Sequence, residues 1–178
     1  MMVQKKTSWN SDKSLSLLAI FLSLGTLLVF LYQTNLIKKQ QYASVLPYLE
    51  IGSENVGTPR FIYAVENKGV GPALIENVEI TYKGKPFDGS HVAYIREFFP
   101  NLNDSIRTKY FYSAFTTGMF IPSGGRVELI QVKDNQYASD ELTQVFGTSN
   151  FGLKVTYKSI YEETWTISSG HVSPIKLD

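Results

Sequence analysis

The sequence contains no cysteine, only two histidines and a modest share of charged residues, 19% of 178. Without cysteine the chain forms no disulfide, ligates no zinc or iron–sulfur cluster through sulfur, and carries no thiolate nucleophile or lipid-modified cysteine. This absence leaves the compartment open, because a cysteine-free domain tolerates oxidising and reducing surroundings alike. With 43% hydrophobic residues the chain is neither disordered nor collagen-like, and its length suits one folded domain with a small additional segment.

Charge is distributed unevenly along the chain. Residues 1–42 hold five lysines and one aspartate, whereas residues 43–178 hold twelve Lys and Arg against fifteen Asp and Glu. The first part is therefore basic and the second part is acidic. Nucleic-acid binding depends on a basic face that neutralises phosphates, so we expect no nucleic-acid partner.

An uncharged stretch extends from Ser14 to Ile37, and its densest apolar part is the 18 residues from Leu15 to Tyr32. As a helix this part spans about 27 Å at about 1.5 Å per residue, close to the ~30 Å hydrocarbon core of a bilayer. A secretory signal has a shorter apolar region and small residues at a cleavage site, and no Ala-x-Ala pattern follows here. We therefore predict an uncleaved transmembrane helix over residues 15–37, with the lipid bilayer as its partner.

The lysines around this segment set the expected orientation. Three lysines precede the segment and two follow it. Under the positive-inside rule this excess favours a cytoplasmic N-terminus. We expect the basic tail, residues 1–14, inside the cell, and a short stalk, residues 38–44, leading to a domain over residues 45–178 on the periplasmic or extracellular side.

Small and hydroxyl side chains occupy one face of the predicted membrane helix. Ser16, Ala19, Ser23 and Thr26 are spaced three, four and three residues apart, so they align along the helix. Such a face lets another transmembrane helix approach, in a homodimer or a larger complex. The alternative is that serine and threonine are tolerated in lipid because they bond their own backbone, and the sequence leaves both interpretations open.

After residue 44 the hydrophobic pattern changes to the period of two that is typical of β-strands. A proline lies in the first expected strand, which is therefore assigned to a sheet edge, and Lys83–Pro86 is expected to be a loop. Seven or so short strands separated by turn residues predict an all-β sandwich, immunoglobulin-like in general architecture. The expected strands cover residues 45–51, 61–66, 74–82, 151–158 and 164–168, and the segments 106–112, 119–121 and 126–132 are expected to supply two or three more.

Two short helical inserts are expected within the sandwich. Between residues 88 and 100 the apolar spacing is three and four, Ser90 is placed to cap the start, and Pro100 stops the run. In the second insert, Ser139 or Asp140 is the expected cap and Gly147 the terminator.

Catalytic and metal-binding patterns are scarce. His91 and His171 are 80 residues apart and neither belongs to a metal-ligand pair, so we expect no metal and no cofactor. A Ser/His/Asp site that uses either histidine stays open, because triads are defined by geometry, yet no nucleophile elbow is present and we predict that the chain is not an enzyme. Glu76 and Glu79 are three apart, which in a strand places them on opposite faces, so we expect that they do not act as a carboxylate pair.

The glycines at 69 and 71 and the aromatic residues near 110 have local interpretations. A phosphate-binding loop would open a helix, so Gly69 and Gly71 are better explained by positive φ angles in a tight connection between strands.

Tyr110, Tyr112 and Phe115 belong to an aromatic run that is richer than a half-buried strand requires. Core packing on one side with an aromatic surface on the other is one explanation, and docking of a peptide or glycan is the other.

Four stretches carry a resemblance to known proteins: residues 32–41, 44–50, 66–73 and 157–165. Together they resemble a diffuse group of uncharacterised bacterial single-span membrane proteins that have a small immunoglobulin-like β-sandwich domain. The resemblance implies a location in the bacterial cytoplasmic membrane and implies no activity.

The combined expectation is a membrane-anchored, non-catalytic β-sandwich that acts as a structural or protein-interaction subunit, with an unknown protein partner. A membrane-tethered sensor that binds a ligand or carbohydrate is the second hypothesis, and a cryptic hydrolase is the third.

Overall fold

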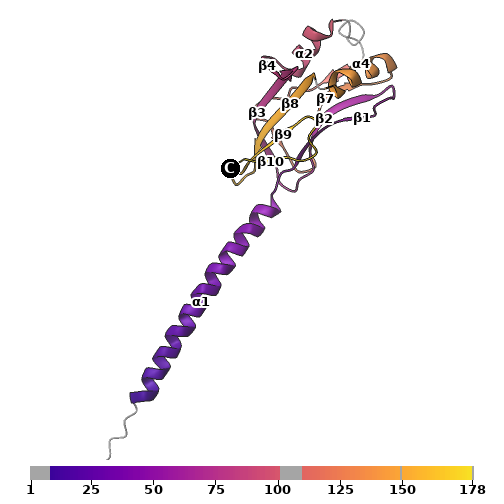
Figure 1. Cartoon of the computed structure of the whole chain (residues 1–178). Coiled ribbons are helices and arrows are strands. Elements are labelled where there is room, and N and C mark those ends of the chain that lie inside the picture. The colour runs from indigo at the N-terminus through magenta and orange to yellow at the C-terminus, as the bar shows by residue number, and fades with distance from the viewer. Residues whose placement is uncertain (1–8, 101–109, 149, 178) are drawn as a thin grey trace, which may run out of the picture. The chain divides into compact units, whose positions relative to one another are not determined.

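The computed structural model describes residues 9–100, 110–148 and 150–177 (Figure 1). The chain divides into two compact units, Met1–Ala43 and Ser44–Asp178. The first contains most of one long helix, and the second contains two antiparallel sheets with short helices. The predicted order of an apolar helix followed by a β domain is confirmed.

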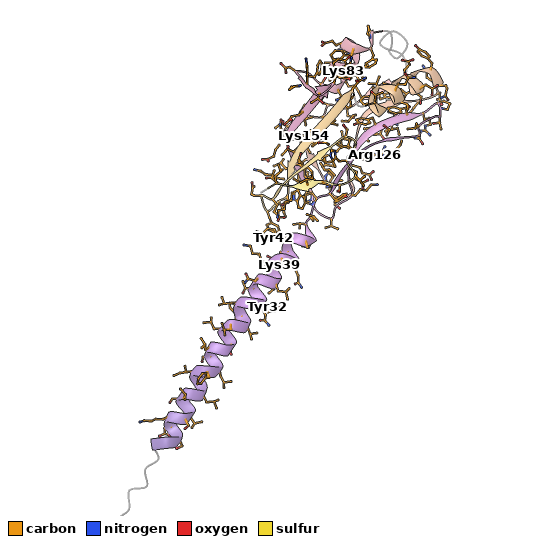
Figure 2. All side chains as sticks on the ribbon, viewed as in Figure 1. Tyr32, Lys39, Tyr42, Lys83, Arg126 and Lys154 are labelled. Atoms are coloured by element: carbon orange, nitrogen blue, oxygen red, sulfur yellow. The ribbon has the colours of Figure 1, made fainter. Side chains whose placement is uncertain are left out.

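Helix α1 (Trp9–Ser44) is 36 residues long. An apolar window of 18 residues within α1 has a mean hydropathy of 2.4, and none of its residues is buried. Side chains project from the helix on every side (Figure 2). The expected span over residues 15–37 lies inside α1, and the expected stalk continues the same helix as far as Ser44. Length and composition suit a membrane anchor and a signal sequence alike.

The first sheet, sheet A, contains four antiparallel strands in the order β1-β2-β7-β5. The sequence predicts a first strand over residues 45–51, but β1 begins only at Leu49, which pairs with Asn67. Strand β1 is an edge strand as expected, whereas the residues before Leu49 bond to a loop instead. The four strands are β1 (Leu49–Glu54), β2 (Phe61–Asn67), β7 (Arg126–Val132) and β5 (Tyr110–Tyr112).

The second sheet, sheet B, has six antiparallel strands in the order β10-β9-β8-β3-β4, with the short strand β6 pairing the start of β3. Strands β3 and β8 form its centre, and β9 forms the predicted hairpin with β8. The six strands are β10 (Ile175–Lys176), β9 (Thr164–Ser168), β8 (Phe151–Lys158), β3 (Ala73–Tyr82), β4 (Lys85–Phe87) and β6 (Phe120–Ile121).

Strand β4 replaces part of a predicted loop. Lys83 and Gly84 have φ angles of 49° and 76°, so they form a two-residue turn that suits a tight hairpin. Pro86 lies opposite Thr81 in the resulting register. In a two-residue hairpin this is a non-hydrogen-bonded position, so the missing N–H of proline costs no ladder bond. The prediction of a loop over Lys83–Pro86 is therefore wrong for its second half.

Both predicted helical inserts are present. Helix α2 (His91–Phe98) has Ser90 as its N-cap, which confirms the expected cap. Helix α4 (Gln136–Gly147) ends at the predicted glycine, but its N-cap is Asn135 and not Ser139 or Asp140. The side chain of Asn135 accepts a hydrogen bond from the N–H of Ala138, which lengthens the helix by one turn.

Aromatic rings join the two helices to both sheets at one end of the domain. Tyr63 of sheet A stacks on Phe146 of α4 at 4.3 Å and meets Phe151 of sheet B edge-on at 5.8 Å. Tyr94 of α2 meets the same Phe151 at 5.0 Å. These rings belong to one hydrophobic core that holds residues of both sheets, so packing and not a disulfide connects the layers.

Candidate functional site

The hydroxyl side chains of α1 are satisfied within their own helix. Ser16, Ser23 and Thr26 each donate a hydrogen bond, 2.8 Å long, to the carbonyl oxygen four residues earlier. Ala19, the fourth member of the predicted face, offers only a methyl group. These bonds support the interpretation that the hydroxyl groups are tolerated in lipid through local bonding. Packing against another transmembrane helix stays a prediction.

The aromatic run lies on the outer edge strand of sheet A. Phe111 and Tyr112 of β5 are exposed, and the ammonium group of Lys133 lies 5.3 Å from the centre of the Phe111 ring. The backbone of Tyr110 is part of β5, whereas its side chain lies outside the described part of the structure. Phe111 is thus exposed as well, although the predicted docking surface did not include it.

Phe115 does not belong to this surface. Its side chain is only 6% exposed and is part of the hydrophobic core. The chain leaves β5 after Tyr112 and crosses toward sheet B, which turns the ring inward. The predicted docking surface of Tyr110, Tyr112 and Phe115 is therefore wrong for Phe115.

Asn67 is a buried polar side chain with five hydrogen bonds among the described residues, and the sequence analysis did not single it out. It is completely buried. Its Nδ2 group donates to the carbonyl oxygens of Gly71, Ile121 and Pro122 at 2.8, 3.1 and 3.2 Å. Because buried polar groups need partners, this amide holds the β2–β3 loop against the start of the β6–β7 connection.

The same amide also holds the segment that follows α1 in the chain. Its Oδ1 atom accepts hydrogen bonds from the N–H groups of Tyr48 and Gly69. The backbone adds bonds from Lys68 N–H to the Tyr48 carbonyl at 2.8 Å and from Val70 N–H to the Leu46 carbonyl at 3.0 Å. The first residues of the β domain are therefore fastened to the domain.

Gly69 and Gly71 are needed for this close approach. A Cβ atom on Gly71 would lie 1.7 Å from the Val45 carbonyl oxygen, and one on Gly69 would lie 2.4 Å from that of Leu46. Neither glycine has a positive φ angle, so the predicted reason for them is wrong. The glycines serve backbone contact with the segment before β1, which a sequence pattern does not reveal.

A β-bulge corrects the prediction for two glutamates. The register of β3 against β8 shifts between Ile75 and Asn77, so one extra residue, Glu76, reverses the alternation. Glu76 forms an ion pair with Lys158 at 2.7 Å, and Glu79 forms one with Lys154 at 3.3 Å. Since both lysines occupy the same face of β8, the glutamates share a face and are neutralised by these ion pairs.

A cavity of about 530 Å³ opens beside the outer edge of β3. Phe115, displaced from the predicted surface, forms part of its wall. The lining combines apolar rings, hydroxyl groups and two carboxylates. It consists of Val78, Glu79, Ile80, Thr81, Pro86, Phe87, Asp88, Gly89, Ser90, Phe115, Thr116 and Thr117.

Neither histidine lines this cavity, although His91 directly follows the lining residue Ser90. His91 is buried, and its neutral ring donates from Nε2 to the Leu129 carbonyl oxygen at 2.8 Å. Burial lowers the pKa of His91 below its usual value, and the bond to Leu129 opposes this shift. His171 lies in an exposed turn after β9. Among the described residues no three acidic or histidine side chains are arranged to hold a metal ion.

Comparisons with protein-family models, with curated proteins and with solved structures find no match for this chain. The geometry of the chain is therefore the basis for any functional assignment.

Proposed function

We propose that this protein is a single-span membrane protein whose β domain is a non-catalytic protein-interaction module. Helix α1 anchors the domain in the bilayer, and the Asn67 contacts keep the domain fastened to the chain that leaves the helix. The resemblance noted in the sequence favours the bacterial cytoplasmic membrane. The excess of lysines before the helix favours a periplasmic or extracellular position for the domain.

The apolar side chains of α1 are the observation that carries this proposal. They surround the helix, and none of its apolar window is buried by the residues that the structure describes. Transfer of such a side chain from water to apolar surroundings is worth roughly 1.5–3 kcal/mol, so lipid stabilises the helix strongly. The exposed set is Leu15, Leu17, Leu18, Ile20, Phe21, Leu22, Leu24, Leu27, Leu28, Val29, Phe30 and Leu31.

Strand order supports an immunoglobulin-like assignment of the β domain. In a constant-type immunoglobulin domain one sheet has the order A-B-E-D and the other G-F-C. The orders β1-β2-β7-β5 and β9-β8-β3 correspond to these when the short strands β4, β6 and β10 are set aside as additions. One architecture of this kind serves many functions, so the strand order supports the fold assignment and not the interaction role.

Membrane integration and orientation are tested with the full chain, which offers a cysteine-free background. We expect the protein to stay in the membrane pellet after carbonate extraction. In intact cells a membrane-impermeant maleimide should label Val172→Cys in the domain, whereas Lys13→Cys should react only after lysis. Release by carbonate would refute the anchor, and the reverse labelling pattern would refute the orientation.

The interaction role is tested by the size of the native protein in mild detergent. The chain has a mass of 20.1 kDa, so a complex with a membrane partner should migrate well above a detergent-bound monomer. Migration only as a monomer across several mild detergents would contradict a subunit role.

The cavity beside β3 favours a second candidate function, a membrane-tethered sensor that binds a ligand or carbohydrate. Its volume of about 530 Å³ falls within the range of about 300–1,000 Å³ that is common for ligand sites. Saturable binding of a sugar from a glycan array, lost when Thr117→Trp fills the cavity, would favour this candidate over the interaction module.

A further inference from the structure

The outer edge of β3 is paired at both ends and open between them. At its start, the N–H of Ile75 donates to the Met119 carbonyl and the Ile75 carbonyl accepts from the N–H of Gly118, both at 2.8 Å. At its end, β4 pairs with residues 80–82. Among the described residues no strand pairs with residues 76–79 on this side.

The register shows which backbone groups face the open edge. Leu153 of β8 directs its N–H and carbonyl toward β9, because both bond to Ser169, at 3.0 and 2.7 Å. Backbone direction alternates along a strand, so Val155 also directs its groups toward β9. Val78 lies opposite Val155 and therefore makes no ladder bond to β8. Its N–H and carbonyl point to the open edge instead.

The cavity described above lies at this edge. Val78 lines the cavity together with the rings of Phe87 and Phe115 and the hydroxyl-bearing residues Thr116 and Thr117. The side chain of Val78 is only partly buried, although it packs against the core. At Val78 an outward-facing backbone N–H, an outward-facing carbonyl oxygen and an apolar pocket thus lie next to one another.

The charge of the lining favours a basic occupant. Two carboxylates and no lysine or arginine line the cavity. Glu79 is already paired with Lys154 at 3.3 Å. Asp88 forms no ion pair within the described part of the chain, so its charge is available to a cation.

We propose that this edge receives an extended segment of the partner protein. One residue of the segment pairs through its own N–H and carbonyl with Val78, its side chain enters the cavity, and a neighbouring lysine or arginine pairs with Asp88. A strand residue presents one donor and one acceptor side by side, which is the complement of Val78, whereas a sugar has no fixed pair of this kind. This inference rests on the proposed role as an interaction module and names the chemistry of its partner.

The test uses the full chain in liposomes and a displayed library of heptapeptides with one central lysine or arginine. We expect selected peptides to bind with a Kd well below about 1 mM. Thr117→Trp should abolish binding by filling the cavity, whereas Ser53→Trp on the exposed edge strand β1 should not. Asp88→Asn should weaken binding about tenfold, and the matched exposed substitution Asp134→Asn should leave it unchanged.

Val78→Pro provides a second, independent variant. It removes the N–H that faces the open edge and no donor of the ladder to β8, so the fold should be kept while peptide affinity falls at least tenfold. Circular dichroism verifies the fold. If Val78→Pro does not fold, the Thr117→Trp and Asp88→Asn pair decides the outcome.

Three results would overturn the proposal: no peptide binding tighter than about 1 mM, binding that Thr117→Trp leaves intact, or occupation of the edge by a second copy of the chain in crosslinking. Flotation of the same liposomes separates this failure from failure of the proposed function. If the chain floats but binds no peptide, the membrane anchor is supported and the docking of an extended segment is refuted. If the chain does not float, the membrane anchor is refuted, while peptide binding still decides the role of the cavity.

Discussion

Apolar side chains are exposed on helix α1 but form a buried core in the β domain. Leu24 of the helix is 52% exposed, whereas Leu153 of the domain is 1% exposed. The helix is apolar on all sides and its apolar window is unburied, so under the proposed function lipid supplies its apolar surroundings. The strands alternate and pack against a second sheet, so the domain supplies its own apolar surroundings.

The polar side chains of the helix and of the β domain also differ, in how far along the chain their hydrogen-bond partners lie. The hydroxyls of α1 bond to carbonyls four residues away, whereas Asn67 bonds to Ile121, which is 54 residues away. Substitutions in α1 should therefore change membrane retention, and substitutions in the domain should change its folding. The following experiments test this separation.

The largest effect is expected from a pair of charges in the middle of α1. Leu24→Lys together with Leu27→Lys should oppose insertion by about 6 kcal/mol, at about 3 kcal/mol for each charge near the bilayer centre. Carbonate extraction should then release most of the protein. Leu36→Lys lies near the end of the predicted span over residues 15–37, where lysine reaches the headgroups, and should leave retention unchanged. Equal release by both variants would mean that the helix does not span a bilayer.

Loss of the Asn67 side chain should destabilise the domain but not the membrane attachment. Asn67→Ala leaves several buried carbonyl and N–H groups without partners, so the free energy of unfolding should fall by about 3 kcal/mol. Chemical denaturation in mild detergent, followed by fluorescence, measures this change. Asn77→Ala, at an exposed position, should cost less than about 0.5 kcal/mol. A similar cost at both positions would show that the Asn67 contacts do not stabilise the domain.

His91 should make the domain sensitive to mild acid. Its pKa is lowered by burial, so the folded domain binds this proton less readily than the unfolded chain, whose histidine pKa is about 6.5. Stability contributed by the neutral ring is complete above this pH and decreases as the pH falls below it. Between pH 7 and 5 the denaturation midpoint of the wild type should fall, and His91→Gln should flatten this dependence. His171→Gln, at an exposed position, should retain it, and a flat wild-type profile would contradict the prediction.

The smallest effect is expected from the hydroxyl groups of α1. Ser23→Ala with Thr26→Val removes only bonds that lie within the helix, so membrane retention should be unchanged. Replacement of Ser16, Ala19, Ser23 and Thr26 by leucine tests the alternative. If crosslinking between membrane helices disappears in that variant, the face packs against another helix.

Local signals predicted much of the fold. The strands β2, β3, β7, β8 and β9, the cap of α2 and the glycine at the end of α4 follow from alternation, turn residues and capping chemistry. Predictions failed where one residue changed the alternation, as at the Glu76 bulge, or where a turn of positive φ created the short strand β4. Such changes depend on pairing partners that are distant in the sequence.

The candidate site was less accessible to sequence reasoning than the fold. Tyr112 is exposed on strand β5, as a surface position requires, but Phe115 is buried in the core because the chain crosses between sheets after β5. Asn67 directly follows one predicted strand, and Val78 lies within another, so neither position stands out in the sequence. Their roles come from bonds and openings that only the packed sheets define.

By itself, the sequence determined the apolar helix and the β character of the remainder. Both depend on periodicity within a few neighbouring residues, because hydrophobic side chains separate from water at the spacing of the local backbone. The tertiary structure alone decided the register, the Asn67 contacts and the open edge at Val78. Each of these depends on which strands, far apart in the chain, pair with one another, so it exists only once the sheets have formed.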